Sequence, residues 1–244
     1  MFKYITSLLI LLVLISCSSE NSFEDEKSSS LIKPNYSQIQ ARYDCALSKD
    51  TSLNRLEAFI PNFVIKVKDA LPSASLEIFF NDQENINNFS LLYLDDDINF
   101  NSSVITTLLY EGGMDNIAEC SLNDDAILSS NFYIDNKSID LDSFEVEVLN
   151  CTFNNGFNFG TFAIEVDSFL NLIRKKGVTY FAKFQQANET SLNFTWINYL
   201  GSIEDKDILY KGWLEEEDSI KIQEAFNLHS TCESSIAYKG YKIL

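Results

Sequence analysis

The chain has 244 residues, with 18 basic and 36 acidic side chains and one histidine, which gives a net charge of −18 at pH 7. A surface this acidic repels phosphate backbones and anionic lipid, so nucleic acid is excluded as a partner and flat adhesion to a membrane is disfavoured. The length is sufficient for one large hydrophobic core or two small ones.

The N-terminal residues have the parts of a secretory signal. Lys3 precedes an apolar run from Leu8 to Ile15, and the small residue Ser16 follows it. This run is shorter than the roughly 20 residues that a membrane-spanning helix needs. An ordinary cleaved signal peptide would have the same parts.

The segment Leu14-Ile15-Ser16-Cys17 resembles the bacterial lipobox. That resemblance implies a signal peptide over residues 1–16, cleavage before Cys17, and diacylglycerol and palmitate-type acylation of this residue. Acyl chains of this kind hold a protein at a membrane durably. Ser18 follows the cysteine, which in enteric-type sorting points to the outer membrane. We therefore expect a lipid-anchored envelope protein whose mature net charge is −19.

Residues 17–35 are polar and cannot bury a core, so we expect a flexible tether there. Four further cysteines follow it: Cys45, Cys120, Cys151 and Cys232. An even number in an exported chain indicates two disulfides, but spacing does not choose among the three possible pairings. Zinc is the alternative, and scattered single cysteines do not favour it. We expect no metal and no cofactor.

The rest of the chain contains the same order of elements twice, in residues 36–135 and in residues 144–244. Each repeat has a strand ending near a cysteine, a helix, two strands, a second helical part and a final strand. In the first repeat the expected elements are a strand ending at 42–47, a helix at 53–67, strands at 76–80 and 89–94, a helix at 103–110 and a strand at 126–134. In the second they are a strand ending at 148–153, a helix at 162–173, strands at 178–184 and 192–200, helices at 205–214 and 219–228 and a strand at 235–243.

Two details of these patterns carry expectations. Pro61 lies inside the first helical pattern and should kink or split that helix. The cysteines of the two repeats are offset by 106 and 112 residues, which indicates a six-residue insertion near 213–219 in the second repeat.

One feature conflicts with the alignment of the two repeats: the apolar residues before Cys45 lie on the same strand face as that cysteine, whereas those before Cys151 lie on the opposite face from it. A β-bulge would reconcile the two; otherwise the alignment is wrong by one residue.

Strand–helix–strand–strand–helix–strand is the ferredoxin-like unit. The chain resembles the dimeric α/β-barrel superfamily, in which two such units pack sheet to sheet. It also resembles exported proteins of marine bacteria whose repeats carry a cysteine, a Phe-x-Trp strand, a Gly-Trp pair and a closing cysteine. The corresponding residues here are Cys151, Phe194-Thr195-Trp196, Gly212-Trp213 and Cys232. The resemblance implies an α+β fold of two tandem ferredoxin-like units that form a pseudo-dimeric α/β barrel.

In the ferredoxin-like unit the first and last strands are antiparallel neighbours. Cys45 and Cys151 lie near the ends of first strands, whereas Cys120 and Cys232 lie at the starts of last strands. We therefore predict the disulfides Cys45–Cys120 and Cys151–Cys232, one within each repeat.

Candidate functional residues are few. The strand around Trp196 and Asn198 is apolar on both faces, which is typical of packed core, but these two side chains could instead line a cavity between the repeats, with Tyr180 and His229 as further polar groups. His229 is the only histidine and lacks the partners of a catalytic site. The segment 95–101 resembles the start of a calcium loop but lacks its glycine and glutamate, so a solvated turn is the better interpretation.

Two functions remain. The main expectation is a non-catalytic envelope protein that binds a small ligand or a protein partner. The alternative is a cofactor-free enzyme of the dimeric α/β-barrel type, monooxygenase- or isomerase-like, that acts on a small hydrophobic molecule in a cavity.

Overall fold

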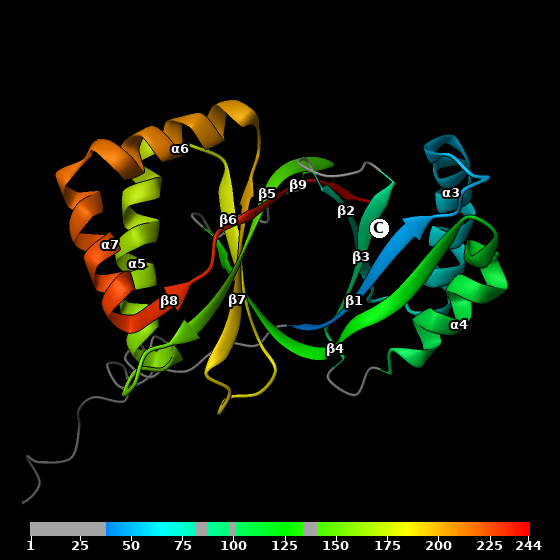
Figure 1. Ribbon diagram of the computed structural model, residues 1–244, viewed down its shortest axis with the longest axis horizontal. Coiled ribbons are helices and arrows are strands. Elements are labelled where there is room, and N and C mark those ends of the chain that lie inside the picture. Colours follow the sequence, from blue (N-terminus) through cyan, green and yellow to red (C-terminus); the bar gives the residue numbers. More distant parts are fainter. Residues whose placement is uncertain (1–37, 82–86, 98–100, 134–140) are drawn as a thin grey trace, which may run out of the picture.

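The computed structural model describes residues 38–81, 87–97, 101–133 and 141–244. Its strands form a single nine-stranded sheet in the order β7-β6-β4-β1-β3-β2-β9-β5-β8, and β7 also pairs with β5. This additional pairing closes the sheet into a barrel (Figure 1). Every strand pair is antiparallel. The chain therefore has the predicted fold class, an α+β barrel.

The first repeat comprises β1 (Gln38–Leu47), α3 (Leu53–Ala70), β2 (Ser75–Asn81), β3 (Asn88–Asp95), α4 (Ser103–Gly112), a 3-10 turn (Met114–Asn116) and β4 (Ala118–Tyr133). The second comprises β5 (Ser143–Phe153), α5 (Phe159–Lys176), β6 (Tyr180–Gln186), β7 (Asn193–Leu200), α6 (Ile203–Glu215), α7 (Glu217–His229), β8 (Ser230–Cys232) and β9 (Ile236–Lys242). This order repeats βαββαβ, as predicted, with an extra helix and a divided last strand in the second repeat. Cys17 and the residues predicted to form a signal peptide and a tether lie outside the described residues.

Helix α3 corrects one expectation. It continues from Leu53 to Ala70 with Pro61 inside it, so the proline does not divide the helix. The helix buries Leu56, Phe63 and Val67 against the sheet, and this packing outweighs the backbone hydrogen bond that proline removes. No helix in the described part of the chain is long and apolar enough to cross a membrane.

The helices lie outside the barrel in two groups. Figure 1 shows α3 and α4 against the strands of the first repeat, and α5, α6 and α7 against those of the second. Each group covers its own hydrophobic core, and a third core, which includes Phe79, Phe144 and Tyr199, lies on the opposite face of the strands. That face is the barrel interior.

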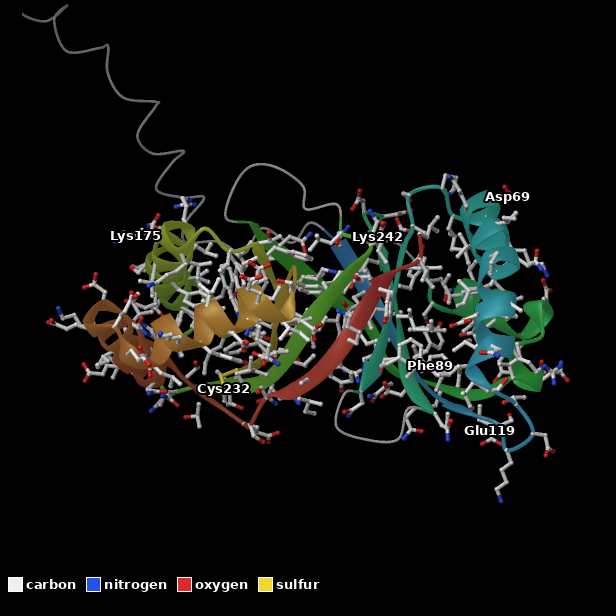
Figure 2. The ribbon with its side chains drawn as sticks, turned by 90° about the horizontal axis from the view of Figure 1, so that it is seen from above. Asp69, Phe89, Glu119, Lys175, Cys232 and Lys242 are labelled. Atoms are coloured by element: carbon white, nitrogen blue, oxygen red, sulfur yellow. A yellow bond between two sulfur atoms is a disulfide. The ribbon has the colours of Figure 1, made fainter. Side chains whose placement is uncertain are left out.

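Both predicted disulfides are present. Cys45 is bonded to Cys120 and Cys151 to Cys232, so each disulfide joins the first and last strands of one repeat. The register pairs the same residues directly across the strands. Figure 2 shows Cys232 along the same end of the barrel as Phe89, the register partner of Cys45, so the two disulfides mark one common mouth.

The strand register also relates the two repeats residue by residue. Cys45 pairs with Phe89, and Cys151 pairs with Phe194 in the same way, so both cysteines face outward and the alignment is not wrong by one residue. The pairing of β5 with β7 and with β9 is continuous, so no bulge in β5 reconciles the two patterns. The two strands instead bury different faces. The apolar residues of β1 lie in the core under α3, whereas Val146 and its neighbours on β5 lie in the barrel interior.

A buried ion pair crosses the barrel interior. Glu77 on β2 pairs with Leu92, and Lys183 on β6 pairs with Ile197. Leu92 and Ile197 each lie three residues after the phenylalanine that pairs with a cysteine, so Glu77 and Lys183 are equivalent positions in the two repeats. Lys183 Nζ lies 2.6 Å from Glu77 Oε1, and the Tyr199 hydroxyl donates to Glu77 Oε2 at 2.8 Å. Burial lowers the pKa of Lys183, and the carboxylate of Glu77 opposes that shift only in part. A Glu–Lys pair therefore joins equivalent positions of the two repeats.

Candidate functional site

Three of the predicted site residues lie on the outer face of the sheet. Trp196 and Tyr180 belong to the hydrophobic core beneath α5, and both donate to Asn198 Oδ1, at 2.7 Å each. None of the three lines the groove or the mouth pockets described below. They therefore form a hydrogen-bonded part of the packed core, and the expectation of an inter-repeat cavity at these residues is wrong.

His229 ends α7 and is buried. Its Nδ1 lies 2.7 Å from the carbonyl oxygen of Ala225, and its ring contacts the Phe157 ring edge-to-face at 4.4 Å. Asp95 ends β3 and is also buried, with the Ser73 hydroxyl donating to it at 2.8 Å. The solvated-turn interpretation therefore does not hold for Asp95.

A groove of about 740 Å³ lies between α3 and the outer face of β2 and β9. Its walls are mainly apolar and consist of Leu53, Leu56, Ile60, Pro61, Ile78, Phe80 and Ile243. Ligand pockets in proteins typically occupy about 300–1,000 Å³ and combine apolar walls with a few polar groups. The groove has this composition, and we take it as the candidate site for a hydrophobic molecule.

Polar side chains line part of the groove. They are Glu57 on α3, Asn81, Asp142, Lys239, Tyr241 and Lys242. Lys239 is held by an ion pair with Glu145, at 2.6 Å. Tyr241 is 39% exposed, and its ring meets the Phe80 ring edge-on at 6.1 Å between centroids. The phenol of Tyr241, the ammonium of Lys239 and the carboxylate of Glu57 are the groups that could exchange a proton with a bound molecule.

The second repeat has no equivalent groove among the pockets described, because larger side chains occupy the same positions. By the strand and helix register, Leu53 and Ile78 of the first repeat correspond to Phe159 and Phe184 of the second. Ile243, which the end of the second repeat adds to the groove, corresponds to Phe132, which β4 of the first repeat adds to the core beneath α5. The Phe159 and Phe184 rings lie 4.5 Å apart, and Phe132 lies 6.2 Å from Phe159. Three phenylalanines thus fill, beneath α5, the space that smaller side chains leave open beneath α3.

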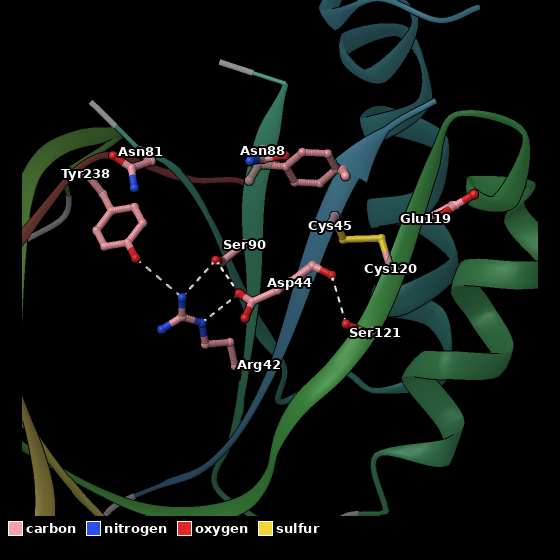
Figure 3. A pocket seen from close by; sticks show the side chains of 12 residues that line it. Arg42, Asp44, Cys45, Asn81, Asn88, Ser90, Glu119, Cys120, Ser121 and Tyr238 are labelled. Atoms are coloured by element: carbon pink, nitrogen blue, oxygen red, sulfur yellow. Dashed lines mark hydrogen bonds and ion pairs between the residues drawn. A yellow bond between two sulfur atoms is a disulfide. The ribbon is translucent and has the colours of Figure 1, made fainter. Parts of the chain in front are cut away.

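A second pocket, of about 580 Å³, opens at the barrel mouth of the first repeat. Arg42 and Asp44, two residues apart on β1, share the inward face there (Figure 3). Arg42 Nε donates to Asp44 Oδ1 at 2.9 Å, and the Ser90 hydroxyl donates to the same oxygen at 2.7 Å. Burial alone would raise the pKa of Asp44, but the hydrogen bond from Ser90 and the charge of Arg42 outweigh it and lower the pKa. Asp44 therefore remains a carboxylate and fixes the guanidinium.

The described residues offer few ligands for a haem or a metal ion. Haem iron is bound through histidine, cysteine, methionine or tyrosine. His229 is packed against Phe157 and lines neither the groove nor the mouth pocket, and all four described cysteines are in disulfides. Among the described residues there is also no group of three or more histidine, cysteine or acidic side chains placed to hold a metal ion. The side chains around the pockets therefore do not fit a histidine- or thiolate-ligated haem.

Comparison of the sequence with family models and with curated proteins gives no match. Solved structures share the fold over most of both chains. A protein from Fusobacterium nucleatum provisionally assigned as a monooxygenase has a TM-score of 0.51 at 11% identity, over 86% of this chain and 94% of that one. A mutant chlorite dismutase from Candidatus Nitrospira defluvii has a TM-score of 0.55 at 6% identity, over 86% and 93%. A protein provisionally assigned as a chlorite dismutase has a TM-score of 0.52 at 10% identity, over 84% and 94%.

These structures share the dimeric α/β-barrel fold of the chain, as the sequence resemblance predicted. They overturn our main expectation of a non-catalytic binding protein, because proteins with this fold over nearly the whole chain are described as enzymes. The alternative, an enzyme acting on a small molecule, is the one that they favour.

Sequence reasoning missed both pockets. The groove depends on side-chain sizes at positions far apart in the chain, so no local pattern predicts it. One sequence pattern does indicate the pocket at the barrel mouth. Gln40, Arg42 and Asp44 alternate with buried apolar residues and therefore share one face of β1.

Proposed function

We propose that the protein is a cofactor-free enzyme of the dimeric α/β-barrel type that acts on a small hydrophobic molecule bound in the groove between α3 and the β2–β9 strands. The observation that carries this proposal is the groove itself: about 740 Å³ with apolar walls and a few polar side chains, in a position that phenylalanines fill in the other repeat. The enzymes that share the fold support it.

The reaction class follows from what the groove provides. Its apolar walls would bind a hydrocarbon skeleton and exclude water, while Tyr241, Lys239 or Glu57 would move a proton. Isomerisation needs only such a proton transfer. Oxygenation by O₂ can proceed when the substrate supplies the electrons: a methylene group becomes a carbonyl, one oxygen atom is retained and the other leaves as water.

Binding can be tested with the neutral fluorescent probe N-phenyl-1-naphthylamine and the chain from residue 18 onward, which keeps every described residue and omits the lipid. We expect the groove to bind the probe. Ile78→Phe, which copies Phe184 of the second repeat, should weaken binding at least about tenfold, or about 1.4 kcal/mol, by filling the site. The melting temperature checks that the variant is folded.

A matched control exchanges the same residues in the other direction. Phe184→Ile removes buried volume from the second repeat and should leave probe affinity in the first repeat unchanged. Equal affinity in wild type and Ile78→Phe would refute the groove as the binding site. Turnover is then measured as O₂ uptake and as proton exchange in D₂O across a panel of phenols and enolisable ketones. Tyr241→Phe and Glu57→Gln test the proton-moving groups.

We also propose that the protein works at the cell envelope, anchored by acyl chains on Cys17. The lipobox-like segment before this residue supports the proposal, and the acidic mature chain is compatible with it. Cells labelled with palmitate should incorporate the label into the wild-type chain and not into Cys17→Ser, which should be unanchored or unprocessed. A wild-type chain without label, or one that fractionates away from the outer membrane, would contradict the respective part of this proposal.

A further inference from the structure

The barrel mouth contains two pockets related by the internal repeat. One, of about 580 Å³, lies beside Cys45–Cys120, and the other, of about 710 Å³, lies beside Cys151–Cys232. Both disulfides lie at the same end of the barrel (Figure 2), so both pockets open at that end, and we call them the first and the second lobe of the mouth. This mouth is on the inner face of the strands and is therefore distinct from the groove under α3.

The first lobe presents a positive group whose charge is already balanced. Asp44 binds Arg42 through Nε, while Nη2 donates to the Ser90 hydroxyl at 3.1 Å and to the Tyr238 hydroxyl at 3.5 Å. Nη1 makes no hydrogen bond within the described part of the chain, and Figure 3 shows one guanidinium nitrogen pointing away from Asp44, Ser90 and Tyr238. Arg42 thus offers fixed N–H donors without a net charge on the pair.

The second lobe is lined largely by neutral hydrogen-bonding side chains. They are Asn150, Thr152, Gln185, Ser191, Asn193, Thr195 and Thr231. Gln185 on β6 reaches over β4 and donates to Gln40 on β1, and Gln40 Nε2 donates back at 3.2 Å. Ser129, which pairs with Gln185 in the strand register, has a fully buried hydroxyl with no hydrogen-bond partner among the described residues. A buried hydroxyl of this kind normally binds a polar partner.

Electrostatics decide the charge of the ligand. An anion entering the first lobe would meet Arg42, which is already neutralised by Asp44, and the exposed carboxylate Glu119 near the lobe. Glu233 adds a further negative charge at the second lobe, and the whole chain carries −18. These carboxylates would attract a cation, but the N–H groups that Arg42 presents in the first lobe can only donate and so need an acceptor oxygen. The ligand best suited to both lobes is therefore uncharged and carries many hydroxyl groups, each of which can donate and accept.

We propose that the barrel mouth binds a neutral polyhydroxylated molecule of sugar size. Arg42 and the Tyr238 hydroxyl bind its oxygens in the first lobe, and the amide and hydroxyl side chains of the second lobe bind its continuation. The first lobe is the stronger subsite. Arg42, Asp44 and Ser90 of the first lobe correspond to Val148, Asn150 and Thr195 of the second repeat, which therefore has no arginine at the equivalent position.

The test is isothermal titration calorimetry on the lipidated chain in detergent, with neutral hexoses and their disaccharides as probes. Glucuronate and glucosamine serve as anionic and cationic counterparts of glucose. We expect at least one neutral sugar to bind, disaccharides to bind more tightly than single hexoses, and both charged counterparts to bind more weakly. Arg42→Met and Tyr238→Phe should each weaken binding at least about fivefold, and Arg42→Lys should restore it only in part, because lysine lacks the planar fork.

The controls separate this proposal from the proposed enzyme. Ile78→Phe fills the groove and should leave sugar binding unchanged, whereas Arg42→Met should leave binding of the naphthylamine probe unchanged. The proposal is overturned if no neutral sugar binds, if glucuronate binds more tightly than glucose, or if Tyr238→Phe and both Arg42 variants bind like wild type. Failure of the naphthylamine probe alone refutes the groove and leaves the mouth standing.

Discussion

Strands β1 and β5 occupy equivalent positions in the two repeats, but before their cysteines they carry their apolar residues on opposite faces. In β1 the apolar residues Ala41 and Tyr43 face the helices, and Arg42 faces the barrel interior. In β5 the apolar residues Val146 and Val148 face the interior, and Glu147 faces outward, where Lys206 of α6 binds it at 3.1 Å. The difference teaches that a duplicated strand can keep its register while its binary pattern is inverted, provided that other residues complete each face.

The inversion divides the barrel interior into a polar side and an apolar side. Gln40 and Gln185 bind each other on one side. Their equivalents Val146 and Phe79 lie in the apolar interior cluster on the other side. The first lobe has Arg42 where β5 has the equivalent Val148, so this difference between the two lobes follows from the inverted pattern of one strand.

The ion pair between Glu77 and Lys183 is the strongest test of this comparison. Removing one charge leaves the other buried, so Lys183→Met should lower the free energy of unfolding by about 3–5 kcal/mol. Glu77→Gln should have a similar effect, since Lys183 then lacks its partner. Urea unfolding at neutral pH measures both.

The double variant Glu77→Met/Lys183→Met is the control, because replacing both charges with apolar groups is often nearly neutral. It should recover most of the stability, except for the acceptor that the Tyr199 hydroxyl loses. Additive losses in the double variant would show that the two positions act independently and that the pair does not join the repeats.

Gly240 and Ser129 are equivalent positions on the apolar and polar sides, and they should respond differently to the same change. A Cβ atom at Gly240 would lie 2.2 Å from a ring carbon of Phe144, so Gly240→Ala should destabilise the fold by about 1–3 kcal/mol through overpacking. Ser129→Ala removes a hydroxyl without a described partner and should be close to neutral. Thermal unfolding compares them, and equal losses would contradict the division of the interior.

The sequence predicts local and repeated features of this molecule well and long-range packing poorly. The element order and both disulfides follow from the duplicated pattern around Cys45 and Cys151. The orientation of Trp196 does not, because a strand that is apolar on both faces has no periodicity to distinguish inside from outside. The groove is similarly unpredictable, since it depends on Ile78 and Ile243 meeting across two strands that the sequence separates widely.

The smallest expected effect is on stability at acid pH. It compares Asp44 of the first repeat with the equivalent Asn150 of the second, which has no titratable side chain. The folded state lowers the pKa of Asp44 below its ordinary value of 3.8, because the hydrogen bond from Ser90 and the charge of Arg42 outweigh burial. Its contribution to stability is therefore fully present above that value and is lost as the pH falls through the lower, folded pKa. The side chain is more than a third exposed, so solvent weakens the effect.

We expect Asp44→Asn to be less stable than wild type at pH 6 and the difference to shrink below about pH 3.8, as measured by urea unfolding from pH 6 to pH 2.5. Asn150→Asp, which lacks an arginine two residues before it, should not gain such an acid-dependent term. A stability difference for Asp44→Asn that stays constant across this pH range would mean that Asp44 acts through packing and not through its charge.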